Sequence, residues 1–166
     1  SSAASDVYKR QGIRSDNQLD ISGGTIETAK GGSGKTTGGA GIYSKGDLSI
    51  EGGTIGSLGP DGKTPDTTTG ALGGTATAGA KGGDGIHSDG SLTISSKATI
   101  GSAIGGDGAP NSDRNAGHGI YSKNGLTIEG NIGTAKGGDA TASGKNGGDG
   151  IHTDGNYSGD NLREGN

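Results

Sequence analysis

One unit recurs five times along this chain, and this repetition limits its possible folds more than any other feature. The dipeptide Gly-Ile stands at residues 12–13, 41–42, 85–86, 119–120 and 150–151, at intervals of 29 to 44 residues. Counted from the glycine, apolar residues return at offsets 1, 7, 9 and near 14, and every isoleucine except Ile104 falls in one of these positions. A short unit that cannot bury its own apolar residues, yet repeats, is typical of a solenoid in which neighbouring copies stack.

Within each copy the apolar residues alternate with polar ones, as in GIYSKGDLSI at residues 41–50. This is the period of a β-strand and not of a helix. Glycine pairs and Asp-Gly or Asn-Gly steps separate the short apolar segments and suit the corners between strands. The sequence therefore predicts an all-β, right-handed parallel β-helix, a single-stranded β-solenoid of about five coils with Gly-rich loops and coils roughly 4.8 Å apart.

Stacking of the copies would place equivalent residues over one another. Each buried aliphatic side chain should then contribute about 1.5–3 kcal/mol to stability. Hydroxyl residues at offset 3 would form an inward rank at a corner, and the variable stretches 27–40, 56–84, 101–118 and 133–149 would form the third side of each coil plus surface loops. The expected interior ladders are Ile13, Ile42, Ile86, Ile120 and Ile151; Leu19, Leu48, Leu92 and Leu126; Ile21, Ile50, Ile94 and Ile128; and Ile26, Ile55, Ile100 and Ile132.

Composition excludes several classes of protein. The 166 residues include 41 glycines but no cysteine, so neither disulfides nor thiolate metal sites can hold the fold. The net charge of −4 makes a nucleic-acid backbone an unsuitable partner, and no apolar run is long enough for membrane insertion. We expect a monomer or a segment of a longer solenoid.

The first residues stand apart from the repeats. Residues 1–11, SSAASDVYKRQ, share no pattern with the rest and resemble translated adapter sequence, so they are set aside as adapter-derived or disordered. Residues 12–166 are then one solenoid repeat domain that we expect to be truncated at both ends. We expect its signal peptide to be missing and its location to be extracellular or at the cell surface.

Two outward columns carry the candidate binding groups. Offset 2 gives an aromatic column, and exposed flat rings along a rigid face suit recognition of a sugar, whose C–H groups contact a ring. Offset 4 reads Asp16, Lys45, Asp89, Lys123 and Asp154, and the alternating charge predicts a ladder of salt bridges. Offset 10 alternates as well, which indicates a two-coil repeat. The predicted carbohydrate-binding residues are Tyr43, His87, Tyr121 and His152, in line with Arg14.

Aspartates beside the Gly-Ile dipeptides are candidate metal ligands. Oxygen-rich turns in stacked coils can bind calcium, which prefers carboxylate and carbonyl oxygens. Gln11, Ala40 and His118 take the position before Gly-Ile in the other three copies. The candidate calcium ligands are Asp84 and Asp149, before Gly-Ile, and Asp89 and Asp154, after it.

One motif resembles a phosphate-binding loop. Residues 29–37, AKGGSGKTT, formally match the relaxed pattern, in which backbone N–H groups and a lysine cradle phosphates. Such a loop works only before a helix whose N-terminus faces the anion. Here a glycine-rich strand pattern follows, so we expect no nucleotide despite the P-loop-like run from Ala29 to Thr36.

The strings GGDGIHSDGSLTIS and AGIYSKGDLSIEGGTI resemble a bacterial surface family of right-handed parallel β-helix carbohydrate-binding domains, of the polygalacturonate- and cellulose-binding type. The likeness covers residues 12 to about 155. It implies a secreted or anchored protein that binds acidic or β-linked plant polysaccharides with calcium. By position it implies acidic calcium ligands at Asp84, Asp149, Asp89 and Asp154.

The sequence leaves three functions open. The first is a non-catalytic domain that binds a polysaccharide or cell-surface glycan, since two of the three histidines recur with the repeat and a catalytic group is normally unique. The second is a structural stalk or adhesin segment of a larger surface protein. The third is an ice-binding protein, for which the outward threonines Thr25, Thr54 and Thr99 are the only support.

Overall fold

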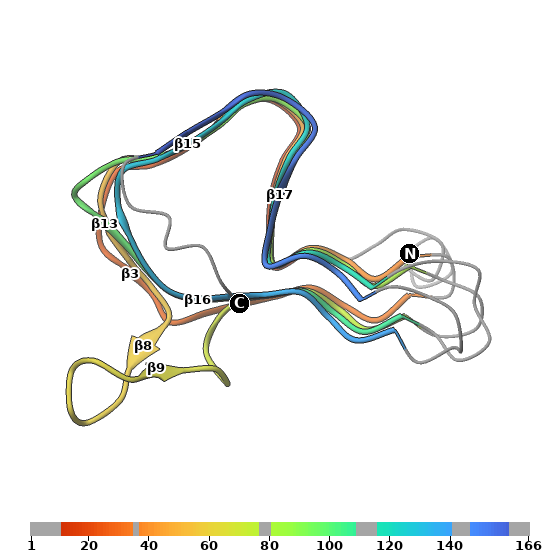
Figure 1. The fold of residues 1–166 in the computed structure, drawn as a ribbon, viewed down its shortest axis with the longest axis horizontal. Coiled ribbons are helices and arrows are strands. Elements are labelled where there is room, and N and C mark those ends of the chain that lie inside the picture. The colour runs from red at the N-terminus through yellow and green to blue at the C-terminus, as the bar shows by residue number, and fades with distance from the viewer. Residues whose placement is uncertain (1–10, 35–36, 77–80, 109–115, 141–146, 160–166) are drawn as a thin grey trace.

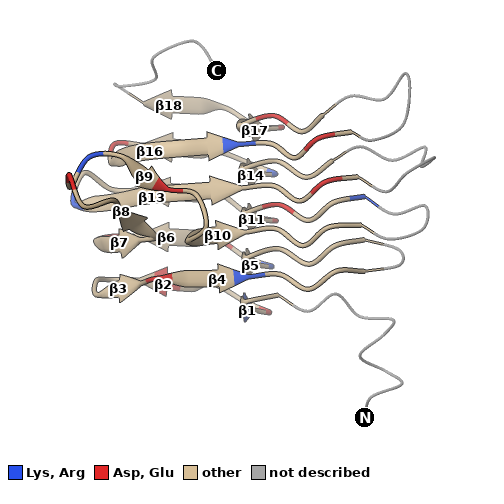
Figure 2. Cartoon of the chain, turned by 90° about the horizontal axis from the view of Figure 1, so that it is seen from below, with Lys and Arg blue, Asp and Glu red and all other residues tan. Residues whose placement is uncertain are grey.

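The computed structural model describes residues 11–34, 37–76, 81–108, 116–140 and 147–159. These residues contain no helix, and their strands are short and parallel apart from one hairpin. Viewed from the side, the coils lie one above another in layers (Figure 2). The all-β, parallel and solenoid-like part of the prediction is therefore confirmed, while the segment expected to be adapter-derived lies, up to residue 10, outside the described residues.

Two faces of the solenoid are five-stranded parallel sheets, in which equivalent residues of successive coils are paired directly. In the first, Ile13 pairs with Ile42, Ile42 with Ile86 and so on through each coil. The second sheet aligns the Leu-x-Ile segments in the same way. The first sheet contains β1 (Ile13–Ser15), β5 (Ile42–Ser44), β11 (Ile86–Ser88), β14 (Ile120–Ser122) and β17 (Ile151–Thr153), and the second contains β2 (Leu19–Ile21), β6 (Leu48–Ile50), β12 (Leu92–Ile94), β15 (Leu126–Ile128) and β18 (Tyr157–Gly159).

The third sheet is less regular because its coils differ in length. The long strand β13 (Ala98–Ile104) pairs with β7 (Gly53–Ile55) along its first half and with β10 (Gly70–Leu72) along its second. β16 (Asn131–Lys136) pairs with the other edge of β13, and β3 (Thr25–Ile26) and β4 (Thr28–Lys30) make up the first coil. The threonines considered for ice binding do align, but Asn131 takes the fourth place of their row.

The expected isoleucine and leucine ladders form the core. Ile42, Ile86 and Ile120 are completely buried, and the aligned leucines and second isoleucines of the middle coils are at most 4% exposed. The end-coil members Ile13 and Ile151 are only partly buried, because each has a stacked neighbour on one side alone. The tube is narrow enough for aliphatic side chains to fill it, which agrees with the absence of Phe and Trp.

Serines at the corner after the first sheet join successive coils. Ser44, Ser88 and Ser122 are completely buried at offset 3. The Ser88 hydroxyl lies 3.0 Å from the carbonyl oxygen of Gly46 on the coil below and 3.2 Å from that of Ser91 in its own turn. Buried hydroxyls with such partners stabilise the corner where unpaired ones would destabilise it.

The glycine pairs form an element that the sequence analysis did not predict. After the third sheet the chain of the first four coils runs outward in one leg, and a second leg leads back to the first sheet, so that a two-layer arm extends from the tube (Figure 1). We call this the glycine arm; its outward legs are 31–34, 73–76, 105–108 and 137–140, and its return legs are 37–41, 81–85, 116–119 and 147–150.

Backbone hydrogen bonds join the two layers of the glycine arm. The Gly83 N–H donates to Gly74 O on the opposite leg of its own coil at 2.9 Å, and the Gly106 N–H donates to Gly83 O on the coil below at 2.7 Å. The same alternation continues through Gly32, Gly39, Gly117, Gly138 and Gly148, so a zigzag of bonds crosses the first four coils. A Cβ at Gly73 would lie 1.9 Å from Gly83 O, which explains why these positions need glycine.

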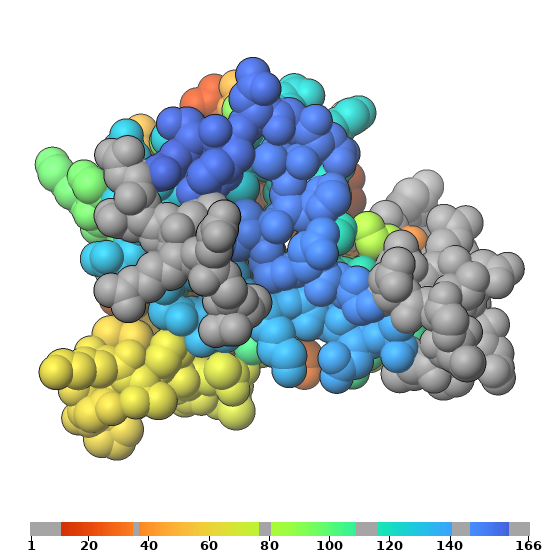
Figure 3. All heavy atoms as spheres, viewed as in Figure 1, coloured from red at the N-terminus to blue at the C-terminus, as the bar shows by residue number. Residues whose placement is uncertain are grey.

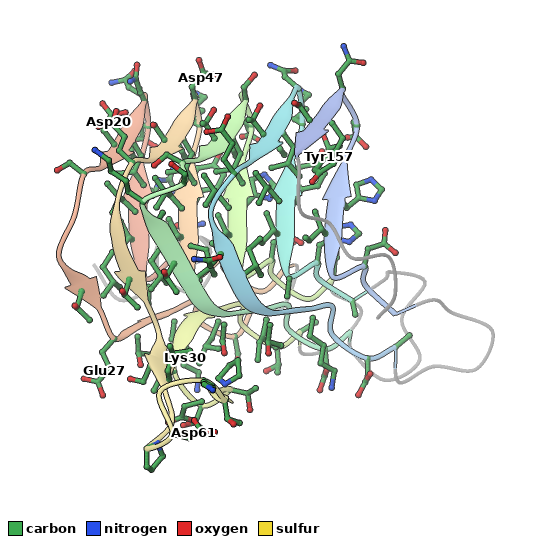
Figure 4. The ribbon with its side chains drawn as sticks, turned by 60° about the vertical axis from the view of Figure 1, so that its left-hand side comes forward. Asp20, Glu27, Lys30, Asp47, Asp61 and Tyr157 are labelled. Carbon is green, nitrogen blue, oxygen red and sulfur yellow. The ribbon has the colours of Figure 1, made fainter. Side chains whose placement is uncertain are left out.

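One coil carries an inserted hairpin, β8 (Ser57–Leu58) and β9 (Pro65–Asp66). The chain leaves the third sheet at Gly56 and rejoins it at Gly70, both with positive φ angles of 89° and 104°. The hairpin projects from the body of the molecule (Figure 3), and Asp61 lies at its outer end (Figure 4). Asp61 Oδ1 accepts the backbone N–H groups of Lys63 and Thr64, which closes this turn.

Two further expectations concern membrane insertion and the P-loop-like run. Among the described residues no helix has the length and hydrophobicity to cross a bilayer. The P-loop-like run begins in strand β4 with the buried Ala29 and continues into the first outward leg of the glycine arm, and the return leg takes over at Thr37. Lys35 and Thr36, its phosphate- and metal-binding positions, lie outside the described residues.

Candidate functional site

The predicted carbohydrate-binding residues lie on one line along the outer face of the first sheet. Tyr43, His87, Tyr121 and His152 are the middle residues of four adjacent strands and are direct register partners. We call these four residues the ring column. All four are half-buried, and the exposed Arg14 continues the line on the first coil with its guanidinium carbon 5.5 Å from the Tyr43 ring centre.

The rings of the column pack on one another. Ring centres lie 5.3 Å apart for Tyr43 and His87, 4.6 Å for His87 and Tyr121, and 5.8 Å for Tyr121 and His152. His118, from the return leg beside the column, stacks on His152 with ring centres at 4.5 Å. Each inner ring therefore has another ring on either side, and the faces that would receive a sugar are largely covered.

The imidazole of His87 is held between two carboxylates. Its Nδ1 lies 2.6 Å from Asp84 Oδ2 and its Nε2 lies 2.9 Å from Asp89 Oδ1. We call Asp84, His87 and Asp89 the lower clamp. Carboxylate oxygens only accept hydrogen bonds, so a ring with both nitrogens against them donates two protons and is a cation. Burial alone lowers the pKa of His87, but hydrogen bonds and charges of both aspartates outweigh it, and the pKa is raised.

The same arrangement recurs two coils higher as the upper clamp, Asp149, His152 and Asp154. His152 Nδ1 lies 2.7 Å from Asp149 Oδ2 and Nε2 lies 3.0 Å from Asp154 Oδ1. The hydrogen bond to Asp149 is the main cause of a raised His152 pKa. The upper clamp is more open to solvent, since Asp149 is 59% exposed and Asp84 only 5%.

Tyrosine hydroxyls connect each clamp to the coil below. Tyr43 donates to Asp89 Oδ2 and Tyr121 donates to Asp154 Oδ2, both at 2.6 Å. Burial and the bond to Asp89 raise the pKa of Tyr43 to about 12. The acceptors of Asp89 and Asp154 are thus shared between a histidine of their own coil and a tyrosine of the preceding coil.

The predicted ladder of Lys–Asp salt bridges is wrong. Among the described residues neither Lys45 nor Lys123 forms an ion pair, and both lysines are exposed. Asp89 and Asp154 turn instead to the half-buried histidine two residues earlier, and Asp16 pairs with Arg14 of its own coil. Long lysine side chains lose rotamer freedom for little gain in an exposed pair, which explains why the alternating charge does not produce contacts.

The four predicted calcium ligands do not converge on one point. Asp84 accepts the backbone N–H of His118 at 2.6 Å as well as His87, and both oxygens of Asp89 and of Asp154 face histidine and tyrosine donors. In the described part of the chain, the one group of three or more ligating side chains is His118, Asp149 and His152, which includes a single predicted calcium ligand.

His118 is a site residue that the sequence analysis did not assign. Its Nδ1 accepts the backbone N–H of Asp149 at 2.9 Å, and burial lowers the pKa of its ring. The signal in the sequence was its position, since it replaces the acidic residue before Gly-Ile, the place taken by Asp84 and Asp149 in the coils on either side.

Comparison with known proteins adds no relative to this geometry. A scan against protein-family models found no match. Searches of curated proteins and of solved structures likewise found no match.

Proposed function

We propose that the chain is a non-catalytic, right-handed β-solenoid segment that acts as a rigid spacer in a secreted or cell-surface protein. The observation that supports this best is the internal use of the ring column. Both nitrogens of His87 and His152 contact carboxylates, and the same carboxylates accept the tyrosine hydroxyls of the coil below. Groups that could bind a ligand are engaged in joining coils. Right-handed coiling rests on the general preference of parallel crossover connections.

A spacer must resist extension along its length. Contacts of four kinds cross every interface between the middle coils: the strand ladders, the buried aliphatic rows, the corner serines and the zigzag of the glycine arm. Because each coil contacts only its neighbours, length can be changed by adding or removing coils without altering the rest, about 4.8 Å at a time.

Mechanical unfolding tests the spacer function directly. The chain would be held at both ends in an optical trap and stretched. A spacer should remain folded up to a defined force and then unfold in a few cooperative steps, and His87→Ala should lower that force because it removes the centre of the lower clamp. Gradual lengthening without a force peak would contradict the proposal.

Glycan binding is a second candidate, supported by a different observation. The four rings of the column are half-exposed along one face at one-coil spacing, beside the exposed Lys45 and Lys123. The edges of these rings and the lysines could contact an acidic polysaccharide such as polygalacturonate or a cell-surface glycan. Calcium could assist through the exposed Asp149 and Asp154.

A glycan array with calcium and with a chelator separates the two candidates. The spacer predicts no enrichment in either condition. Glycan binding predicts that the protein is retained on the array. The double variant Tyr43→Ala with Tyr121→Ala should abolish this retention, whereas Asp20→Asn, a change on the outer face of the second sheet, should not affect it. Retention unaffected by the tyrosine changes would refute the ring column as the binding site.

A further inference from the structure

Three ligating side chains meet where the return leg of one coil faces the first strand of the next. His118 precedes β14, and Asp149 and His152 belong to the coil above it. Asp149 Oδ2 lies 2.7 Å from His152 Nδ1 and 3.8 Å from His118 Nδ1, and one ligand atom from each residue lies within 4.8 Å of the others. The group is thus assembled from two coils and joins them.

The two-coil repeat supplies an internal comparison. Two coils lower, the places of His118, Asp149 and His152 are taken by Ala40, Asp84 and His87. The lower copy therefore keeps the aspartate and histidine but lacks the third ligand. Its aspartate is also buried and accepts a backbone N–H of the coil above, whereas Asp149 is 59% exposed. The lower site thus differs from the upper one in two ways: it has alanine in place of the third ligand, and its aspartate is buried and already hydrogen-bonded.

The donor atoms suit one class of ion. Two imidazole nitrogens and one carboxylate oxygen match Zn²⁺, Ni²⁺ or Co²⁺, while calcium takes oxygens alone. His118 Nδ1 accepts the backbone N–H of Asp149, so this nitrogen carries a lone pair and not a proton.

The surroundings of His152 match those of a metal ligand. A metal-bound histidine commonly donates its other ring N–H to a carboxylate, which fixes the ring. His152 Nε2 lies 3.0 Å from Asp154 Oδ1, and Tyr121 holds the other oxygen of that carboxylate. An ion would replace the proton between His152 Nδ1 and Asp149 Oδ2, with that proton released to solvent.

From this arrangement we propose that His118, Asp149 and His152 form a binding site for one divalent transition-metal ion of the zinc type, with its remaining coordination positions open to water. The rings of His118 and His152 lie within 14° of parallel, so they must tilt toward each other to share the ion. His118 would exchange its bond to the Asp149 N–H for the ion. The ion would fasten the coil that contains β17 to the coil below it.

Calorimetric titration of the tag-free chain with Zn²⁺ tests the site. We expect one ion per chain, and a loss of at least tenfold in affinity for His118→Ala, which copies the Ala40 of the lower coil and should fold. Asp20→Asn removes an exposed carboxylate of the first coil, far along the stack from the coil of Tyr157 (Figure 4), and should bind as wild type does. Asp154→Asn should weaken binding about ten- to hundredfold.

Cobalt gives a readout that a merely structural change would not produce. Co²⁺ bound by two histidines and a carboxylate should show visible absorption bands that His118→Ala and Asp149→Asn both remove, while circular dichroism confirms that the variants fold. The proposal is overturned if wild type binds no stoichiometric ion. It is also overturned if folded His118→Ala binds with unchanged affinity.

Discussion

The hydroxyl of Tyr43 donates a 2.6 Å hydrogen bond to Asp89 Oδ2, 46 residues away in sequence and one coil away in space. The same carboxylate contacts His87 through its other oxygen. One tyrosine thus connects its coil to the clamp above it, and Tyr121 repeats the connection with Asp154. Hydrogen bonds on the outer face of the first sheet therefore hold successive coils together, in addition to the aliphatic core beneath it.

The tyrosine link predicts a measurable loss of stability. Tyr43→Phe keeps the ring and removes only the bond to Asp89, and a hydrogen bond to a charged group contributes about 1.5–3 kcal/mol. Because the pair is partly exposed, we expect a loss near the lower end of that range in urea unfolding. Lys45→Gln is the control, since this exposed lysine forms no ion pair among the described residues and should change stability by less than about 0.5 kcal/mol. Equal losses would contradict the link.

The stacked core predicts a difference between middle and end coils. Ile86→Ala removes a completely buried side chain and should cost about 2–5 kcal/mol. Ile13→Ala makes the same chemical change in the first coil, where the side chain is only partly buried, and should cost clearly less. Thermal or urea unfolding of both variants provides the measurement. Indistinguishable costs would show that the rows are not stacked as described.

The glycine arm predicts an unusual sensitivity to a single methyl group. Gly73→Ala would place Cβ 1.9 Å from Gly83 O, a clash between two backbones that cannot move independently, and should cost about 1–3 kcal/mol or more. Gly23→Ala is the matched control, because nothing lies within 4 Å of its Cβ position. Hydrogen exchange should report loss of protection in residues 81–85 for Gly73→Ala alone. If residues 81–85 kept their protection in Gly73→Ala, the two layers would have to lie further apart than in this structure.

The lower clamp predicts a pH window. The His87 pKa is raised in the folded state, so its contribution is complete below the unfolded value of about 6.5 and is lost as pH rises through the folded value. Burial alone would raise the pKa of Asp84 and of Asp89. At Asp84 the bond to His87 outweighs burial, and at Asp89 the bonds from Tyr43 and His87 do, so both pKa values are lowered. Their contribution is complete above about pH 4 and is lost as pH falls through the lowered values.

The pH window can be read as a difference between two proteins. The stability of wild type relative to His87→Gln should be greatest between about pH 4 and 6.5 and should decline toward pH 9. The lowered pKa of His118 acts in the opposite sense, and the raised pKa of His152 in the same sense, but both are present in the two proteins and cancel in the difference. A difference that grows with pH would contradict an imidazolium at His87.

The ladders could be predicted from the sequence because they depend on a period alone. Ile42 over Ile86 and Ser44 over Ser88 follow once equivalent offsets are stacked, and no side-chain geometry is needed. The salt-bridge ladder failed because charge alternation does not say which partner a carboxylate reaches, and Asp89 finds His87 two residues away. The burial of Asp84 and the role of His118 depend on how the return leg approaches the first sheet. The position of a residue within the repeat does not give this information.

The glycine arm was missed for a related reason. Glycine pairs suit turns as well as close-packed layers, and a single pair such as Gly73 with Gly74 does not distinguish them. The signal was the recurrence of a glycine pair on both legs in three of the four coils, as with Gly73 and Gly74 before, and Gly82 and Gly83 after; in the remaining coil Ala116 and Gly117 take the second place. Two layers that must approach to backbone contact need glycine on both.

Disulfide trapping between coils tests the vertical register most directly, because the chain contains no cysteine. Ser49 and Thr93 are outward register partners on β6 and β12, and cysteines placed there should be about 4.8 Å apart at Cα, within the reach of a disulfide. Cysteines at Ser49 and Thr127, two coils apart, should be beyond that reach. The stacked coils predict rapid oxidation of the first pair only, measured by mass spectrometry of non-reduced peptides. Failure of the first pair, or equal oxidation of both, would contradict them.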